Sequence, residues 1–136
     1  MIWAQNAKVL IVCGDPSNFK KNDNLCNDLR ESFGMSGLSV SSVDVCDDRN
    51  KEIIANLDNI DVIILTGGHV PTQNKFMKEI QLRKHLSNYN GIVVAWSAGS
   101  MNCADIVYAG PGEPLGAFIA AMAGIYMGRL VSGKTK

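Results

Sequence analysis

Three short runs of nearly continuous valine, isoleucine and leucine constrain the fold of this chain more than any other feature. They read KVLIVC at 8–13, DVIILT at 61–66 and GIVVAW at 91–96. Runs of this length without polar alternation are typical of strands that are covered on both faces in a parallel sheet. A fourth run, LSVSSVDV at 38–45, alternates more, which favours an edge strand.

Helical patterns fill the intervals between these runs. Residues 22–33, 47–57 and 72–86 carry apolar residues at helical spacing, and the third stretch follows a proline. Strands that alternate with helices predict right-handed crossovers and an α/β fold, namely a three-layer α/β/α sandwich with a mostly parallel sheet. Sites in such sheets form outside the carboxyl ends of the strands. We therefore look for chemistry directly after each apolar run.

Charge and cysteine content narrow the class of protein. The 13 basic and 13 acidic residues balance, so no basic excess indicates a nucleic-acid partner. The four cysteines have no metal-binding spacing with one another or with the two histidines, which predicts reduced thiols and no metal site. The first residues lack the pattern of a signal peptide. These observations predict a cytoplasmic protein with one compact domain.

The last apolar run leads into IVVAWSAGSMNCA at 92–104, which predicts a nucleophile elbow at Ser97. In this motif a buried strand turns sharply into a helix, and the nucleophile projects beyond the sheet edge. Because strand and helix then cross closely, the residues two before and two after must be small, and here they are Ala95 and Gly99. The alternative is an ordinary serine that caps a helix.

A second motif lies at the end of the apolar run at 61–66, where TGGH at 66–69 carries two consecutive glycines. Paired glycines allow a turn whose N–H groups face the sheet edge. An acyl-transfer site needs two such donors for the oxyanion, and we predict the N–H groups of Gly68 and Ala98. The alternative is that the pair only forms a turn.

Together, TGGHVPTQN at 66–74 and GIVVAWSAGSMNCADIVY at 91–108 resemble the peptidase E-like proteins, the dipeptidase E and cyanophycinase family of serine peptidases. The resemblance covers about residues 8–108. It implies a class I glutamine amidotransferase-like fold of flavodoxin-like type and hydrolysis of short peptides, in some members those with an N-terminal Asp. It also implies no metal or organic cofactor. Amidotransferases carry Cys at the elbow, so Ser97 indicates the peptidase branch.

The sequence departs from the family where the general base should be. In the family a histidine beyond the elbow helix activates the serine, with an acidic partner, but no histidine follows Ser97 here. His69 is a candidate substitute base or pocket residue, and His85 lies in a basic stretch that predicts a solvated side chain. Asp105 and Glu113 are candidate acids. Whether this chain is an active enzyme is therefore left open.

Three polar residues near the two motifs carry weaker expectations. Gln73 and Asn74 should begin the helix after the glycine pair. Asn102, on the elbow helix, should either face the pocket or bond back to its own helix.

The composition changes near residue 109 and predicts two regions. Residues 1–108 form the α/β nucleophile-elbow domain, and 109–136 form an atypical Gly/Ala-rich tail for which a non-native origin is an alternative. The stretch 114–128 is too short to span a membrane. A phosphate-loop pattern at 128–135 has no room for the helix that such a site requires. An incomplete sheet would leave an open edge, which favours a homodimer.

Three functions follow from these patterns. The first is a serine peptidase of the dipeptidase E type that acts on small peptides. The second is a catalytically inactive, truncated homologue or a small-ligand-binding α/β domain. The third is a hydrolase of small esters.

Overall fold

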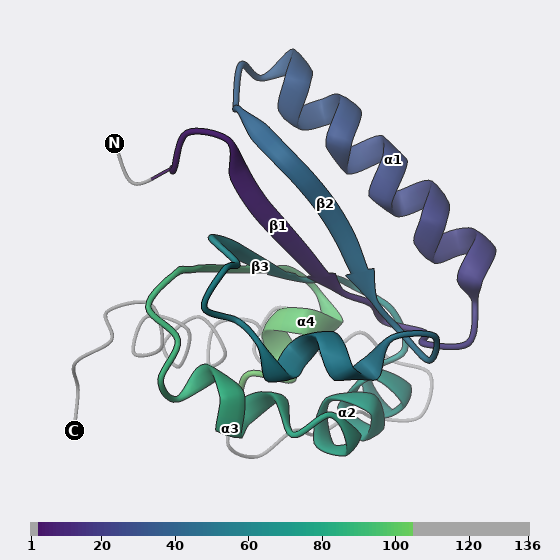
Figure 1. Ribbon diagram of the computed structural model, residues 1–136. Helices are drawn as coiled ribbons and strands as arrows, with labels where there is room; N and C mark the ends of the chain where they lie inside the picture. Colours follow the sequence, from purple (N-terminus) through teal and green to yellow (C-terminus); the bar gives the residue numbers. More distant parts are fainter. Residues whose placement is uncertain (1–2, 105–136) are drawn as a thin grey trace.

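The computed structural model describes residues 3–104, in which parallel strands alternate with helices (Figure 1). The strands are β1 (Ala7–Val12), β2 (Val40–Cys46), β3 (Val62–Leu65) and β4 (Ile92–Ala95). The helices are α1 (Phe19–Met35), α2 (Val70–Glu79), α3 (Leu82–Leu86) and α4 (Ala98–Met101), with a short 3-10 helix η1 (Lys51–Ala55). The predicted helix at 22–33 is thus longer at both ends.

The four strands form one sheet in the order β2-β1-β3-β4, and every neighbouring pair is parallel. This is the order of the first four strands in flavodoxin-like sheets. The more polar run at 38–45 lies at an edge as β2, as its alternation predicts. The nearly continuous apolar runs supply β1, β3 and β4, and every residue of β3 is buried.

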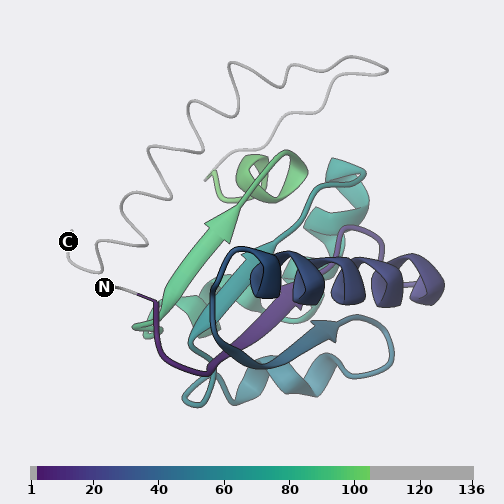
Figure 2. The ribbon, with the colours of Figure 1, turned by 90° about the horizontal axis from the view of Figure 1, so that it is seen from above.

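The helices cover the two faces of the sheet unequally. Figures 1 and 2 show α1 on one face, whereas η1, α2 and α3 lie on the other. Large side chains of the strands and of α2, among them Leu10, Ile11, Ile63 and Phe76, are almost completely buried between these layers. The predicted α/β fold with a parallel sheet between helical layers is therefore confirmed.

The predicted helix over 47–57 was wrong in length, since residues 47–50 form a turn that is closed by their own side chains and only Lys51–Ala55 is helical. Asn50 accepts a hydrogen bond from the N–H of Asp47 at 3.0 Å and donates to the carbonyl of Val45 at 2.7 Å. Asp47 in turn accepts from the N–H of Arg49. These bonds hold residues 45–50 in a turn, and the short helix η1 follows it.

The predicted helix over 72–86 divides at Gln81, which adopts a left-handed conformation with φ 54° and ψ 41°. The break lets Ile80 and Leu82, which flank it, both reach the core, where they are 5% and 4% exposed. A continuous helix would rotate these positions about 200° apart around its axis.

No helix among residues 3–104 has the length and apolar character needed to cross a membrane.

Candidate active site

Ser97 lies between the end of β4 and the start of α4, at the carboxyl edge of the sheet, and its side chain is exposed. Its backbone has φ 51° and ψ −127°, a strained combination for a residue other than glycine. The carbonyl of Ser97 already accepts the N–H of Met101 at 3.0 Å. The chain therefore passes from strand to helix within two residues, Trp96 and Ser97, and Ser97 is exposed to solvent.

Gly99 has no room for a side chain, which agrees with the size limit expected two residues after the serine. A Cβ added to Gly99 would lie 2.1 Å from the carbonyl oxygen of Leu65 and 2.8 Å from that of Thr66. Both atoms belong to the backbone at the end of β3, so they cannot swing away. Ala95, two residues before the serine, pairs with Leu65 in the sheet and is half-buried.

The glycine pair after β3 lies directly beside Ser97. A Cβ added to Gly67 would lie 3.1 Å from Ser97 Cβ and 3.4 Å from Ser97 Oγ. Gly68 has φ 152°, which a side chain would strain. Within residues 3–104 the N–H groups of Gly68 and Ala98 have no hydrogen-bond acceptor. The structure therefore brings the two motifs of the sequence together at one edge of the sheet.

Gly14, which follows β1, is a third close approach that sequence reasoning missed. A Cβ there would lie 2.2 Å from the carbonyl oxygen of Gly67. The available signal was a glycine directly after the buried run at 8–13, at the edge where sites are expected. The backbone that follows β1 thus lies against the backbone of the glycine pair that follows β3.

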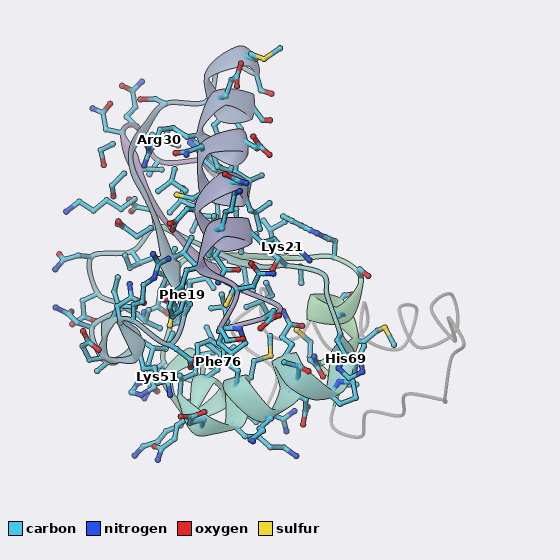
Figure 3. The ribbon with its side chains drawn as sticks, turned by 90° about the vertical axis from the view of Figure 1, so that its right-hand side faces the viewer. Phe19, Lys21, Arg30, Lys51, His69 and Phe76 are labelled. Atoms are coloured by element: carbon cyan, nitrogen blue, oxygen red, sulfur yellow. The ribbon has the colours of Figure 1, made fainter. Side chains whose placement is uncertain are left out.

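The two histidines occupy different ends of the molecule. His69 is exposed just before α2 (Figure 3), and its Nδ1 lies 2.8 Å from Thr72 Oγ1. Among residues 3–104 neither histidine has a hydrogen bond to Ser97. His85 is half-buried rather than solvated. It lines a cavity of about 420 Å³ near the amino ends of β3 and β4, where Ile60 and Gly91 also lie.

Gln73 and Asn102, which are buried, and Asn74, which is half-buried, form a hydrogen-bond network between α2 and α4. Gln73 Nε2 donates to the carbonyl of Thr66 at 2.6 Å, and Asn102 Nδ2 donates to Gln73 Oε1 at 3.0 Å. Asn74 Nδ2 completes the chain by donating to Asn102 Oδ1 at 3.1 Å. Gln73 and Asn74 do lie in the first turns of α2. Asn102, however, faces that helix rather than a pocket or its own backbone.

A buried carboxylate, Asp47, follows β2 at the same edge of the sheet. It accepts hydrogen bonds from Asn22 and from Arg49, whose guanidinium also binds Asp23 and lies 4.6 Å from the centre of the Phe19 ring. Burial raises the pKa of Asp47, but the hydrogen bonds from Arg49 and Asn22 outweigh it and leave the pKa below its ordinary value. Asp47 is thus a carboxylate that ties α1 to β2.

The thiols offer no alternative nucleophile among the described residues. Burial raises the pKa of Cys13, Cys46 and Cys103 to about 12 each, so these side chains stay protonated near neutral pH. Cys103, on the turn after α4, donates to the carbonyl of Gly99. The described residues also contain no group of three or more His, Cys, Asp or Glu side chains placed to hold a metal ion.

Comparison with known proteins gives one match, and it covers most of the chain. The family model of Peptidase family S51 matches residues 3–111. No curated protein and no solved structure matches the chain at a significant level. The matched region includes the glycine pair, the elbow and all described strands. The predicted boundary at residue 108 and the tail after it lie outside the described residues.

Proposed function

Because this chain belongs to peptidase family S51, a family of serine peptidases, we propose that it hydrolyses short peptides with Ser97 as the nucleophile. The observation that carries the proposal is the backbone at Ser97, with φ 51° between a strand and a helix and with Gly67 against its side chain. A structure of this kind holds a hydroxyl out at the sheet edge in one fixed direction. Strain of this size persists only where the surroundings impose it.

The proposed reaction uses groups that the site presents. Ser97 Oγ attacks the peptide carbonyl carbon, and its proton passes to a general base. The N–H groups of Gly68 and Ala98 donate to the oxyanion of the tetrahedral intermediate, each contributing on the order of 10²–10³ in rate. The C–N bond then breaks, the amine leaves with a proton, and water hydrolyses the acyl-enzyme. Ala95 and Gly99 keep the elbow small enough to form.

The general base is the open part of this mechanism. His69 is the candidate within the described part of the chain, either as the base or as a residue that lines the substrate pocket. A His69→Gln variant separates the two roles. Loss of the base lowers the maximal rate at saturating substrate by about 10²-fold or more. Loss of a pocket contact mainly raises the concentration needed for saturation.

A fluorophosphonate probe tests the nucleophile directly, because it reacts with activated serines. We expect the intact chain to be labelled at Ser97 and Ser97→Ala to remain unlabelled, with both proteins folded. Ser87→Ala is the matched control, since Ser87 is exposed and its hydroxyl only donates to the carbonyl of Lys84. It should be labelled as fast as the unmodified chain. Folded protein that resists the probe would overturn the proposal.

Substrate class is tested on the labelled protein. Dipeptides with an N-terminal Asp, matched dipeptides with an N-terminal Asn, and p-nitrophenyl acetate separate the peptidase of dipeptidase E type from an esterase. Faster turnover of the Asp dipeptide supports the proposed substrate, whereas turnover of the ester alone supports the esterase.

One observation favours a second function, which is ligand binding without turnover. Within residues 3–104 no side chain is hydrogen-bonded to Ser97 Oγ, and a serine without a base is a poor nucleophile. In that case peptides bind near His69 but are not cleaved. Binding of an Asp dipeptide measured by calorimetry, together with no product, would support this function.

We also propose a cytoplasmic location and a small peptide as the partner, without nucleic acid, membrane or cofactor. The four free cysteines support a reducing compartment. A homodimer remains a proposal, and light scattering of the purified chain tests it.

A further inference from the structure

Two buried amide side chains, Gln73 on α2 and Asn102 directly after α4, link the glycine pair to the elbow. Gln73 is completely buried and Asn102 is 8% exposed. Buried amides are costly unless each polar atom has a partner. In the described part of the chain no buried side-chain nitrogen or oxygen lacks one. The network is therefore complete, and its removal would leave donors and acceptors without partners.

Every hydrogen of the Gln73 amide is directed at the end of a strand. Its Nε2 donates to the carbonyl of Thr66, at the end of β3, at 2.6 Å and to that of Cys13, after β1, at 3.5 Å. Its Oε1 accepts from Asn102. Rotating the amide by 180° would place Oε1 against two carbonyl oxygens, so only one orientation satisfies the site.

Asn102 connects this amide to the elbow. Its Nδ2 donates to Gln73 Oε1 at 3.0 Å and to the carbonyl of Val70 at 3.2 Å. Its own N–H donates to the carbonyl of Ala98 at 2.9 Å. Asn102 thus touches the first turn of α2 with its side chain and the first residue of α4 with its backbone.

The strand ends that Gln73 holds are those that lead into the glycine contacts. Thr66 directly precedes Gly67, which lies against Ser97, and Cys13 directly precedes Gly14, which lies against Gly67. We infer that Gln73 and Asn102 are positioning residues, which fix the distance between the glycine pair and Ser97 through the carbonyls of Thr66 and Val70. Because both side chains are buried, we place their action on the backbone and not on a bound peptide.

This role rests on the proposed function of Ser97, and a Gln73→Glu variant tests it through pH. When the new carboxyl is protonated, its O–H can donate to Thr66 and its other oxygen can accept from Asn102. When it is ionised, it presents negative charge to two carbonyls. Burial raises the pKa of such a carboxyl above its ordinary value of about 4.3. We expect the carboxyl introduced by Gln73→Glu to ionise within the pH range where the protein can be assayed.

The measurement is the maximal rate of fluorophosphonate labelling from pH 5 to pH 9, divided by that of the unmodified chain at each pH. We expect the ratio to fall at least tenfold as pH rises, with unchanged half-saturation by the probe, since a displacement of about 1 Å can cost about 10²-fold in rate. Far-UV circular dichroism at each pH restricts the comparison to folded protein. A ratio that stays constant across this range would overturn the inference.

Asn50→Asp is the matched control, because Asn50 is also an amide that donates to a strand-end carbonyl, that of Val45 at 2.7 Å. It lies beside β2, the strand farthest from β4 in the sheet. Its labelling ratio should stay within about twofold of the unmodified chain, whatever it loses in stability. A parallel fall in this control would mean that any new carboxyl beside a strand-end carbonyl slows labelling, and it would overturn the inference.

Asn74→Ala provides a variant that should fold even if Gln73→Glu does not, because alanine favours the helix. It removes the donor to Asn102 Oδ1, so we expect a smaller loss of labelling rate, of about threefold to tenfold. No loss would contradict the network.

Hydrogen exchange of residues 66–69 separates this inference from the proposed function. In Gln73→Glu these amides should exchange faster than in the unmodified chain at high pH, but not at low pH. If the unmodified chain is never labelled and exchange still changes this way, the function fails and the positioning role stands. If the chain is labelled while both exchange and the labelling ratio stay unchanged, the positioning role fails alone.

Discussion

A methyl group at position 99 should damage both the fold and the site, because the elbow helix lies directly on the end of β3. The Cβ of Gly99→Ala would lie 2.1 Å from the carbonyl oxygen of Leu65 and 2.5 Å from its carbonyl carbon. Carbon–oxygen contacts below about 3 Å are rare even for weak hydrogen bonds, so α4 must move by about 1 Å. The obstacle is backbone within the central part of the sheet, so the helix moves and the strand does not.

The expected cost follows from this displacement. Forcing extra volume into a well-packed contact typically costs about 1–3 kcal/mol in the free energy of unfolding. Because Ala98 and Ser97 move with the helix, the maximal rate of fluorophosphonate labelling should fall by about 10²-fold. Urea unfolding followed by circular dichroism gives the first quantity, and a labelling time course gives the second.

Gly34→Ala is the matched control, since it makes the same change where nothing lies within 4 Å of the new Cβ. Gly34 is inside α1, so alanine there should stabilise the protein by about 0.5–1 kcal/mol and leave labelling unchanged. If Gly99→Ala matched Gly34→Ala in both measurements, the close approach of α4 to β3 would be refuted, and with it the geometric basis of the elbow.

Two further substitutions test strain and charge at the sheet edge. Ser97→Gly should have a free energy of unfolding about 1 kcal/mol higher than that of Ser97→Ala, measured by urea unfolding. Glycine adopts φ 51° without steric cost, whereas alanine keeps the strain. Equal free energies would show that the backbone is relaxed. Asp47→Asn should lower stability at pH 7 by about 1–3 kcal/mol. The folded-state pKa of Asp47 lies below its ordinary value, so its contribution is present above pH of about 4 and is lost as pH falls through the folded-state pKa. The difference from the unmodified chain should therefore shrink towards pH 2, and a pH-independent difference would contradict the role of the charge.

The strands could be predicted because their signal is local. The apolar runs of β1 and β3 are covered on both faces, so they could be recognised without knowing their partners, and the alternation of β2 predicted an edge strand. The same prediction of cover on both faces was wrong for β4, which lies at the other edge of the described sheet and leaves Val94 40% exposed. The breaks at η1 and Gln81 could not be read in this way. The turn before η1 depends on hydrogen bonds between side chains and the backbone, such as that of Asn50 with the N–H of Asp47. The break at Gln81 accompanies the burial of both Ile80 and Leu82.

The residues of the site likewise fall into those that local sequence predicts and those that depend on contacts across the fold. The sequence could predict the positions of Ser97, Gly99 and the glycine pair, because an elbow and a tight turn restrict residue size at fixed spacing. Gly14 and the pair Gln73–Asn102 act across the fold, between segments 29 to 60 residues apart in the sequence. A single sequence carries no mark of which strand end a buried glutamine will reach. The expectation that Asn102 faces a pocket or its own helix was wrong for that reason.

The bonds that hold the glycine pair in place have a consequence for kinetics. Gln73 donates to the backbone carbonyls of Thr66 and Cys13. Asn102 donates to the side-chain oxygen of Gln73 and to the backbone carbonyl of Val70. No ionisable group takes part in them, so the separation between the glycine pair and Ser97 should not change with pH while the protein is folded. A pH dependence in the labelling of Ser97 must then come from the base that removes its proton. In the unmodified chain the titration curve thus reports the base alone, and the same curve in His69→Gln decides whether that base is His69.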